Sequence, residues 1–328
     1  VLGAGSWGTT VASLASENVH TTLWSRRAET AQEVDERHRN TDYLEDRELC
    51  AELEATDALE DAVATADVLA LAVPSHGFRA VLESAAPHVR PWIPIVSLTK
   101  GLEQETRKRM TEVIDDVLPG HPSGLLAGPN LAKEVLDGYA AAAVISMPDQ
   151  HVAQSLQEVF ATTAFRIYTN TDVIGCELGG ALKNVMAIAA GMAEGLGVGD
   201  NTRATVITRA LSEITRLGLA MGGEPRTFAG LTGMGDLMAT CMSPQSRNRT
   251  VGEKLAQGMS AEEIADDMNM VAEGIKTARV VMELASEHDV EMPIAQEVDA
   301  VVSGDRTAQE AFAGLLRLEP TSEIHGPG

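Results

Sequence analysis

The stretch Val1-Leu2-Gly3-Ala4-Gly5-Ser6-Trp7-Gly8 places the pattern GxGxxG directly after two apolar residues that read as the end of a strand. Residues Thr9 to Ser16 then predict a helix, and a second strand, His20 to Trp24, follows after one helix length. A bare GxGxxG is a weak signal in a chain with 29 glycines. Its position inside a strand-helix-strand unit is more specific and is typical of a dinucleotide-binding sheet domain.

The glycines and the end of the second strand predict how a dinucleotide would bind. Gly3 permits the tight turn, Gly5 lets the backbone approach the pyrophosphate, and Gly8 lets the helix pack closely on the strand. Arg26 and Arg27 then stand where an acidic residue would accept a hydrogen bond from the ribose 2′-hydroxyl of NAD. Two guanidinium groups suit a 2′-phosphate, so the sequence favours NADPH over NADH. The alternative is a pair of surface arginines at a strand end.

Further apolar runs predict the remaining strands of a sheet that is covered on both faces. These runs are residues 68–73, 93–97, 124–127, 140–146 and 165–168. Polar or glycine-containing loops follow three of them, at Pro74-Ser75-His76, Thr99-Lys100-Gly101 and Gly128-Pro129-Asn130. Ligands of open α/β sheets bind beyond the carboxyl ends of the strands, so Lys100 is predicted to be a cation at the ligand edge.

Strand signals stop near Tyr168, and amphipathic helices take over. The pattern predicts helices over residues 178–194, 203–221, 248–257, 261–267, 274–288 and 295–303. We therefore expect a nucleotide-binding domain over residues 1–168 and a helical domain over residues 169–328.

One lysine in the first of these helices is placed where burial is costly. The run from Leu178 to Ala193 contains two polar side chains, Lys183 and Asn184, in an otherwise apolar or glycine sequence, which predicts a buried helix. A buried ammonium group loses its hydration and needs a partner or a lowered pKa. Gly179 and Gly180 precede it on the same helical face and would leave room for a ligand. The alternative is a lysine that snorkels to solvent.

Two polar loops of the helical half could complete a site. Asp236 follows Gly233-Met234-Gly235, and Ser246-Arg247-Asn248-Arg249 opens a helix. Two guanidiniums, a hydroxyl and an amide at a helix N-terminus suit a phosphate. An exposed basic turn explains the second loop equally well.

Composition and charge exclude several classes of protein. A net charge of −23 argues against binding nucleic acid or anionic membranes. Cys50, Cys176 and Cys241 lie far apart, and the eight histidines form no HExxH pair, so no metal site is expected. No signal peptide or uninterrupted spanning segment is evident, which together with the cysteine usage predicts a cytoplasmic protein without membrane insertion.

Taken together, these residues resemble the bacterial NAD(P)-dependent glycerol-3-phosphate dehydrogenase family over essentially the full chain. The motifs that carry the resemblance are GxGxxG with Ser6-Trp7, Val73-Pro-Ser-His76, Thr99-Lys-Gly-Leu102, Ala127-Gly-Pro129, Gly179-Gly-Ala-Leu-Lys-Asn184, Gly235-Asp-Leu237, Ser246-Arg-Asn-Arg249 and Val271-Ala-Glu-Gly274. The resemblance implies a Rossmann-like doubly wound α/β sheet followed by an all-α C-terminal domain of the 6-phosphogluconate dehydrogenase type.

The resemblance also implies reversible reduction of dihydroxyacetone phosphate to sn-glycerol 3-phosphate for phospholipid synthesis, in a homodimer. Lys183 would be the general acid and base. Residues that would bind substrate are Lys100, Gly128, Asn130, Lys183, Asp236, Ser246, Arg247 and Asn248. Residues that would contact NADP(H), or NAD(H), are Gly3, Gly5, Ser6, Trp7, Gly8, Arg26, Arg27, Tyr43, Lys100, Ala132, Arg247, Val271 and Glu273. The family usually has Ser or Thr at position 130, where this chain has Asn.

Two other functions remain as alternatives. A β-hydroxyacid or 6-phosphogluconate-type dehydrogenase also joins a dinucleotide domain to a helical domain with a glycine-preceded lysine. That lysine is commonly followed by Asn four residues later, whereas this chain has Ala187. A non-catalytic protein that senses nicotinamide cofactors is the second alternative, and it would have no use for a buried lysine.

Overall fold

The computed structural model describes residues 1–268 and 272–316. The chain forms two compact units, Val1–Glu177 and Leu178–Gly328. The boundary between them along the chain falls within one helix, α9 (Val173–Gly195). The first unit contains every strand of the described residues, and the second is helical.

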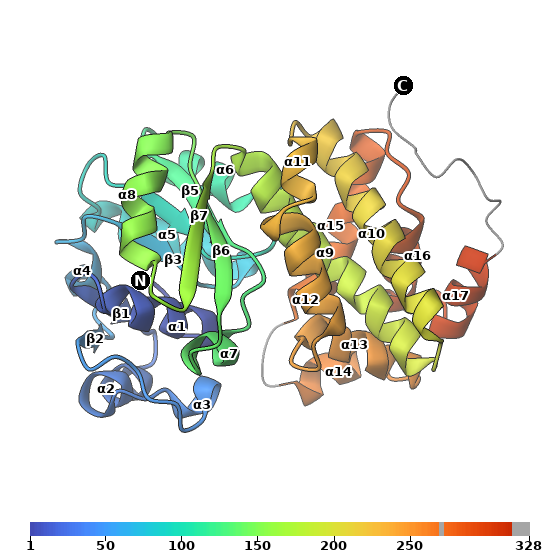
Figure 1. The fold of residues 1–328 in the computed structure, drawn as a ribbon, viewed down its shortest axis with the longest axis horizontal. Helices are drawn as coiled ribbons and strands as arrows, with labels where there is room; N and C mark the ends of the chain where they lie inside the picture. Colours follow the sequence, from blue (N-terminus) through green and yellow to red (C-terminus); the bar gives the residue numbers. More distant parts are fainter. Residues whose placement is uncertain (269–271, 317–328) are drawn as a thin grey trace. The chain divides into compact units, whose positions relative to one another are not determined.

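The first unit is built on a twisted sheet (Figure 1). Its strands are β1 (Thr21–Trp24), β2 (Leu53–Thr56), β3 (Leu69–Leu71), β4 (Ile95–Ser97), β5 (Ser123–Ala127), β6 (Ala141–Ser146) and β7 (Phe165–Asn170). Leu2 forms parallel bridges to both Trp24 and Leu71, so it joins β2-β1 to β3-β4-β5-β6-β7. Its central place puts the GxGxxG turn at the middle of the sheet, where the strand order reverses.

Pairing along this sheet is parallel except between β5 and β6, which run antiparallel. The Rossmann-like fold expected from the sequence is confirmed. All the strands predicted from apolar runs are present with shifts of a few residues. The sequence missed β2, because its alternation of Leu53, Glu54, Ala55 and Thr56 is too short and too polar to stand out.

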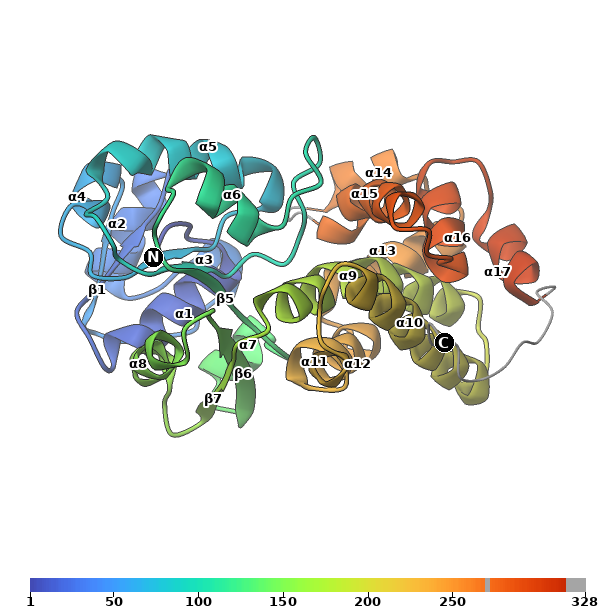
Figure 2. The same cartoon turned by 90° about the horizontal axis from the view of Figure 1, so that it is seen from above.

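Helices cover both faces of the sheet, as Figure 2 shows with α1 and α8 on one face and α5 and α6 on the other. The helical segments of this unit are α1 (Ser6–Ser16), α2 (Ala28–Arg37), α3 (Thr41–Leu44), α4 (Leu59–Val63), α5 (Ser75–Ala85), the 3₁₀ turn Ala86–His88, α6 (Met110–Val117), α7 (Ala132–Leu136) and α8 (Gln150–Phe160). One buried cluster includes Val11, Leu156 and Ile145, and another includes Phe78, Ile114 and Ile95. Burial on both faces explains why the central strands are apolar without alternation.

The second unit consists of helices grouped around α9 (Figure 1). They are α10 (Asp200–Ala220), α11 (Pro225–Phe228), a π-helical turn (Leu231–Gly235), α12 (Asp236–Met242), α13 (Arg247–Ala256), α14 (Ala261–Asp267), α15 (Glu273–Glu287), α16 (Pro293–Val302) and α17 (Ala308–Leu316). All six predicted helices are confirmed, although α9 begins at Val173 rather than Leu178. Four segments were missed, namely α11, the π-helical turn, α12 and α17.

Close packing of α9 on α13 depends on glycines. A Cβ atom at Gly191 would lie 2.0 Å from the carbonyl oxygen of Arg249, and one at Gly252 would lie 2.1 Å from the carbonyl oxygen of Ile188. Backbone therefore touches backbone where the two helices cross. This approach brings the side chains on either side of the crossing, including Asn184 and Asn248, within hydrogen-bonding distance.

Helix α9 is also long and apolar enough to cross a membrane by length and composition. Most of its length is buried inside the protein. A core helix passes the same test, so this helix is no evidence for membrane insertion.

Candidate active site

The three glycines of the first turn each meet a different environment. Gly3 has φ +114°, and a Cβ atom there would lie 2.7 Å from the carbonyl oxygen of Ala72. A Cβ atom at Gly8 would lie 2.0 Å from the carbonyl oxygen of Gly3, whereas one at Gly5 would meet nothing within 4 Å. Gly3 and Gly8 are thus needed for the turn and for packing. Gly5 faces open space, as a backbone that receives a pyrophosphate must.

The N-terminus of α1 follows this turn and carries Ser6 and Trp7. Trp7 packs edge-to-face on Phe165, with ring centroids 6.1 Å apart. Its indole Nε1 is buried and has no hydrogen-bond partner among the described residues. Buried donors are nearly always paired in native proteins, so this N–H is suited to a ligand acceptor.

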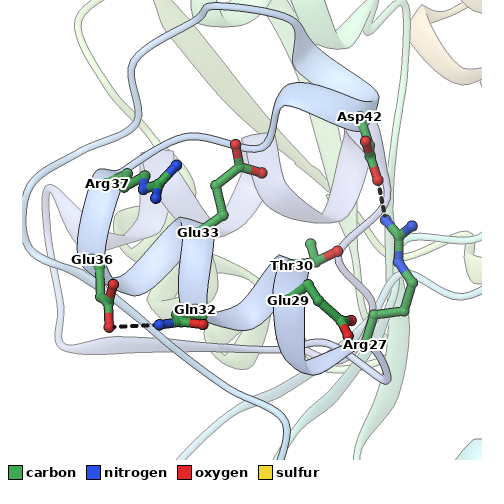
Figure 3. A pocket seen from close by; sticks show the side chains of 8 residues that line it. All are labelled: Arg27, Glu29, Thr30, Gln32, Glu33, Glu36, Arg37 and Asp42. Carbon is green, nitrogen blue, oxygen red and sulfur yellow. Dashed lines mark hydrogen bonds and ion pairs between the residues drawn. The ribbon is translucent and has the colours of Figure 1, made fainter.

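Arg27 follows β1, as predicted, and its guanidinium already has two neighbours. Its Nη2 lies 2.8 Å from Oδ2 of Asp42, and its Cζ lies 5.6 Å from the ring centroid of Tyr43. Figure 3 shows Arg27 and Asp42 pointing toward each other at one side of a groove that α2 also lines. Arg26 is exposed beside it.

Tyr43 and Ala132 come from distant parts of the sequence but lie against one cluster. Together with Ala4 of the glycine turn, both pack on the buried side chains around Leu23 and Leu44. The first unit therefore groups the glycine turn, Tyr43 and Ala132 around one small core.

The loops after β3, β4 and β5 are tied to one another by hydrogen bonds. Thr99 Oγ1 donates to the carbonyl oxygen of Val73 over 2.6 Å, and Lys100 Nζ donates to the carbonyl oxygen of Gly128 over 2.8 Å. Gly128 has φ +147°, which favours glycine, and a Cβ atom there would lie 3.0 Å from Cα of Ala143. Lys100 and Gly128, two predicted substrate residues, are thus in contact at the carboxyl edge of the sheet.

Asn130 lies beside this pair. Its Oδ1 is close enough to Gly128 that a Cβ atom there would approach it to 3.2 Å. Within the described residues, neither Oδ1 nor Nδ2 of Asn130 has a hydrogen-bond partner, although both atoms are buried. A buried amide without partners costs about 1–3 kcal/mol. A polar ligand that meets both atoms would recover that free energy.

In the second unit, Lys183 is buried and paired. Its side chain is 6% exposed, its Nζ lies 2.7 Å from Oδ1 of Asp236, and it also donates to Oγ1 of Thr240. Thr240 Oγ1 lies 2.7 Å from the carbonyl oxygen of Asp236 and 3.2 Å from its Oδ1. The lysine does not snorkel to solvent, so that alternative is wrong.

The turn that carries Asp236 is itself irregular. It begins with the π-helical turn Leu231–Gly235 and continues as α12, which places Asp236 and Thr240 one helical turn apart on the same face. The sequence identified Asp236 but not Thr240, whose spacing of four residues was the available signal. π-Helical turns are frequent at functional sites.

One of the two glycines that were expected to leave room for a ligand beside Lys183 has no such room. A Cβ atom at Gly179 would lie 2.7 Å from the carbonyl oxygen of Thr232, so the chain's own backbone occupies that space. The expectation that Gly179 leaves room for a ligand is wrong. The glycine instead lets the π-helical turn approach α9 closely enough for Asp236 to reach Lys183.

Cys241 follows Thr240 and lies near the ion pair. Burial raises the pKa of its thiol to about 12, with Lys183 opposing the shift. A thiol with this pKa is protonated at neutral pH and is a poor nucleophile. The second unit therefore offers Lys183, not Cys241, for chemistry.

A chain of amides connects α9, α13 and α15. Asn248 Nδ2 donates to Oδ1 of Asn184 over 2.9 Å, and the backbone N–H of Gly274 donates to Oδ1 of Asn248 over 3.0 Å. Glu273, a predicted cofactor contact, is the first residue of α15 beside Gly274. Asn184, which the sequence analysis noted only as polar, thus holds the side-chain amide of Asn248.

The two arginines of the basic turn before α13 have different surroundings. Ser246 is the N-cap, with its Oγ accepting from the N–H of Arg249 over 3.2 Å, and Arg247 is exposed. Arg249 Nε lies 2.8 Å from Oε1 of Glu253, and its Nη2 lies 3.6 Å from Oε1 of Glu194. The expectation of two guanidiniums for a phosphate is therefore wrong for Arg249, which two carboxylates hold. Arg247 stays a candidate, and Val271 lies outside the described residues.

Among the described residues, no group of three or more His, Cys, Asp or Glu side chains is arranged to hold a metal ion.

Comparison with known proteins covers nearly the whole chain. Residues 1–153 match the family described as NAD-dependent glycerol-3-phosphate dehydrogenase N-terminus. Residues 172–313 match the family described as NAD-dependent glycerol-3-phosphate dehydrogenase C-terminus.

Individual relatives agree with this match. The chain is 58% identical to a glycerol-3-phosphate dehydrogenase [NAD(P)+] of Sphingopyxis alaskensis, over 100% of this chain and 98% of that protein. It is 56% identical to one of Mycobacterium avium, over 100% of this chain and 96% of that protein. The crystal structure of glycerol-3-phosphate dehydrogenase from Coxiella burnetii superposes with a TM-score of 0.92 at 34% identity, over 97% of this chain and 98% of that chain.

Proposed function

Because the chain belongs to the NAD(P)-dependent glycerol-3-phosphate dehydrogenase family, we propose that it reversibly reduces dihydroxyacetone phosphate to sn-glycerol 3-phosphate. The observation that carries the proposal is the buried ion pair of Lys183 and Asp236. A buried ammonium held by one carboxylate is suited to stabilise negative charge on a substrate oxygen and to exchange a proton with it.

The first unit holds residues that fit NADP(H) or NAD(H). The open space at Gly5, the unpaired indole N–H of Trp7 and the cluster under Tyr43 and Ala132 support a dinucleotide at the start of α1. Arg26 and Arg27 are the cations for a 2′-phosphate. When bound, the reduced cofactor supplies the hydride that C2 of the ketone accepts.

Lys183 holds the proton that the ketone oxygen takes up during reduction. Asp236 keeps that proton on Nζ until transfer, and Thr240 fixes the direction of the ammonium group. In the reverse direction, the same Nζ accepts the hydroxyl proton of glycerol 3-phosphate.

Three further sets of residues recognise the substrate. Asn130, with both amide atoms buried and unpaired, offers a donor and an acceptor to a hydroxyl or a carbonyl. Ser246, Arg247 and Asn248 at the N-terminus of α13 offer donors to the phosphate, with Asn248 fixed by Asn184. Lys100 supplies a second cation from the sheet edge.

The remaining assignments follow from the same family membership. We propose that residues 1–168 bind the cofactor and that residues 169–328 carry the acid-base chemistry. The enzyme acts in the cytoplasm, as a homodimer, and feeds glycerophospholipid synthesis.

The test is a cofactor-oxidation assay on the purified protein. NADPH absorbance should fall when dihydroxyacetone phosphate is added, and Lys183→Met should abolish most of that rate at a temperature where the variant is still folded by circular dichroism. Lys254→Met, an α13 lysine paired with Asp267, is the matched control and should retain activity. Oxidation of 6-phosphogluconate or 3-hydroxyisobutyrate in place of dihydroxyacetone phosphate reduction would instead support the dehydrogenase alternative.

A further inference from the structure

Arg27 is the cation predicted to favour NADPH, yet the structure pairs it with an acid. The ion pair with Asp42 measures 2.8 Å, and the Tyr43 ring lies under the same guanidinium. Both partners are accessible, with 46% of the Arg27 side chain and 61% of the Asp42 side chain exposed. Sequence analysis assigned no role to Asp42, because this residue lies well beyond the strand end that normally carries the acid.

Asp42 lies on a segment that hydrogen bonds hold in place. It lies in α3, and the residue before this helix, Asn40, donates to the carbonyl oxygen of Ala4 over 3.0 Å and to Oγ1 of Thr9 over 2.8 Å. Asn40 is fully buried. The first turn that would receive the pyrophosphate and the helix that carries Asp42 are therefore directly connected.

A second connection fixes the other side of α3. Thr41 donates through its Oγ1 to Oε1 of Glu33 over 2.8 Å and through its backbone N–H to Oε2 over 3.2 Å. Glu33 belongs to α2, whose N-cap is Arg27. Asp42 thus faces Arg27 from a helix that is anchored to both α1's turn and α2, not from a loose surface loop.

The groove around this pair is acidic as well. It has a volume of about 490 Å³, and its lining includes Glu29, Glu33 and Glu36 beside Asp42, against the two cations Arg27 and Arg37 (Figure 3). A 2′-phosphate entering here must displace a carboxylate from Arg27 and approach further negative charge. A ribose 2′-hydroxyl carries no such charge and can donate to a carboxylate.

We propose that Asp42 is a specificity-determining residue that lowers the preference for NADPH and lets the enzyme use NADH as well. Asp42 competes with the 2′-phosphate for Arg27, and it supplies the acceptor that the end of β1 lacks. This inference rests on the proposed function, since it concerns the cofactor of the same reaction.

Asp42→Asn removes the competing charge and keeps the side chain's size. The ratio of kcat/KM with NADPH to kcat/KM with NADH should rise about threefold to tenfold, mainly through a lower KM for NADPH. Asp42→Glu keeps the charge and should stay close to the unmodified protein. Asp46→Asn, an exposed acid four residues away, removes the same charge outside the groove and should change the ratio less than about twofold.

A binding measurement separates this inference from catalysis. Calorimetric titration with adenosine 2′,5′-bisphosphate should show tighter binding to Asp42→Asn than to the unmodified protein. Binding of 5′-AMP should instead be weaker, because its 2′-hydroxyl loses a charged acceptor. An unchanged or lower ratio in both experiments would overturn the role of Asp42. If the unmodified protein reduces dihydroxyacetone phosphate with neither cofactor, the proposed function itself fails, whereas activity with an unmoved ratio removes only this inference.

Discussion

Two ion pairs of nearly equal length stand in the two units of this protein. Lys183 and Asp236 approach to 2.7 Å with side chains 6% and 2% exposed, while Arg27 and Asp42 approach to 2.8 Å with side chains 46% and 61% exposed. Water screens the second pair and not the first. The two ion pairs therefore suit different purposes. Burial keeps the proton on Lys183, whereas exposure allows Arg27 to exchange Asp42 for an anion of a ligand.

The largest effect should follow removal of the buried cation. Lys183→Met keeps an apolar chain of similar volume and should lower kcat about 10²- to 10⁴-fold, because the ketone oxygen loses its proton donor and its charge stabilisation. Steady-state rates with dihydroxyacetone phosphate and NADPH measure this loss. A rate within twofold of the unmodified protein would assign Lys183 to structure alone.

Removal of the buried anion tests how much the buried pair contributes to the free energy of unfolding. Asp236→Asn leaves the ammonium facing a neutral amide in a buried site and should lower the free energy of unfolding by about 3 kcal/mol. Replacing both partners, as Lys183→Met with Asp236→Leu, should regain part of this loss, because no buried charge then remains. Denaturant unfolding followed by far-UV circular dichroism measures both, because the second unit is helical, whereas the three tryptophans all lie in the first unit.

Asp267→Asn is the matched control for that experiment. Asp267 pairs with Lys254, and its side chain is 58% exposed, so its loss should cost less than about 1 kcal/mol. Equal destabilisation by Asp236→Asn and Asp267→Asn would break the distinction between buried and exposed pairs.

Sequence patterns located the fold, both members of the buried pair and Arg27, but not Asp42. The GxGxxG turn placed the sheet, and the apolar run around Lys183 placed α9, because periodicity and glycine spacing act over a few residues. Asp42 reaches Arg27 through the anchors of Asn40 and Thr41, which a local pattern does not encode. Thr240 and the close approach at Gly179 likewise depend on how the π-helical turn packs on α9.

The same reason explains the error at Arg249. Its place beside Arg247 predicted a shared phosphate, but on a helix neighbouring residues point in different directions. Glu253 lies four residues later, on the same face, and captures Arg249.

A buried carboxylate in the second unit tests the effect of burial through pH. Glu213 in α10 accepts from the N–H groups of Ile294 and Ala295 at the start of α16 over 2.8 and 3.2 Å, with Arg216 and Arg209 as more distant charges. Burial raises its pKa from 4.5 to about 7, against the effect of these donors. Between these values the folded state holds a proton that the unfolded chain releases.

Glu213 should therefore make the protein less stable as pH rises from about 5 to about 7, with no further loss above pH 7. Its share of the change is on the order of 1–3 kcal/mol. Melting temperatures of the unmodified protein and Glu213→Gln, compared across this range, isolate that share, because all other groups are common to both. Parallel curves for the two proteins would contradict the raised pKa, whereas a flatter curve for Glu213→Gln supports it.

The smallest effect on stability should come from the exposed pair. Arg27→Ala and Asp42→Asn should each change the free energy of unfolding by less than about 1 kcal/mol, because solvent already screens both charges. Their effects on cofactor preference should nevertheless be opposite, since Arg27→Ala removes the cation that a 2′-phosphate needs. Added salt should reduce the difference between Asp42→Asn and the unmodified protein, because screening weakens both the competition and the attraction. A loss of several kcal/mol in either variant would mean that the pair holds α3 in place, and its exposure would then no longer separate it from Lys183 and Asp236.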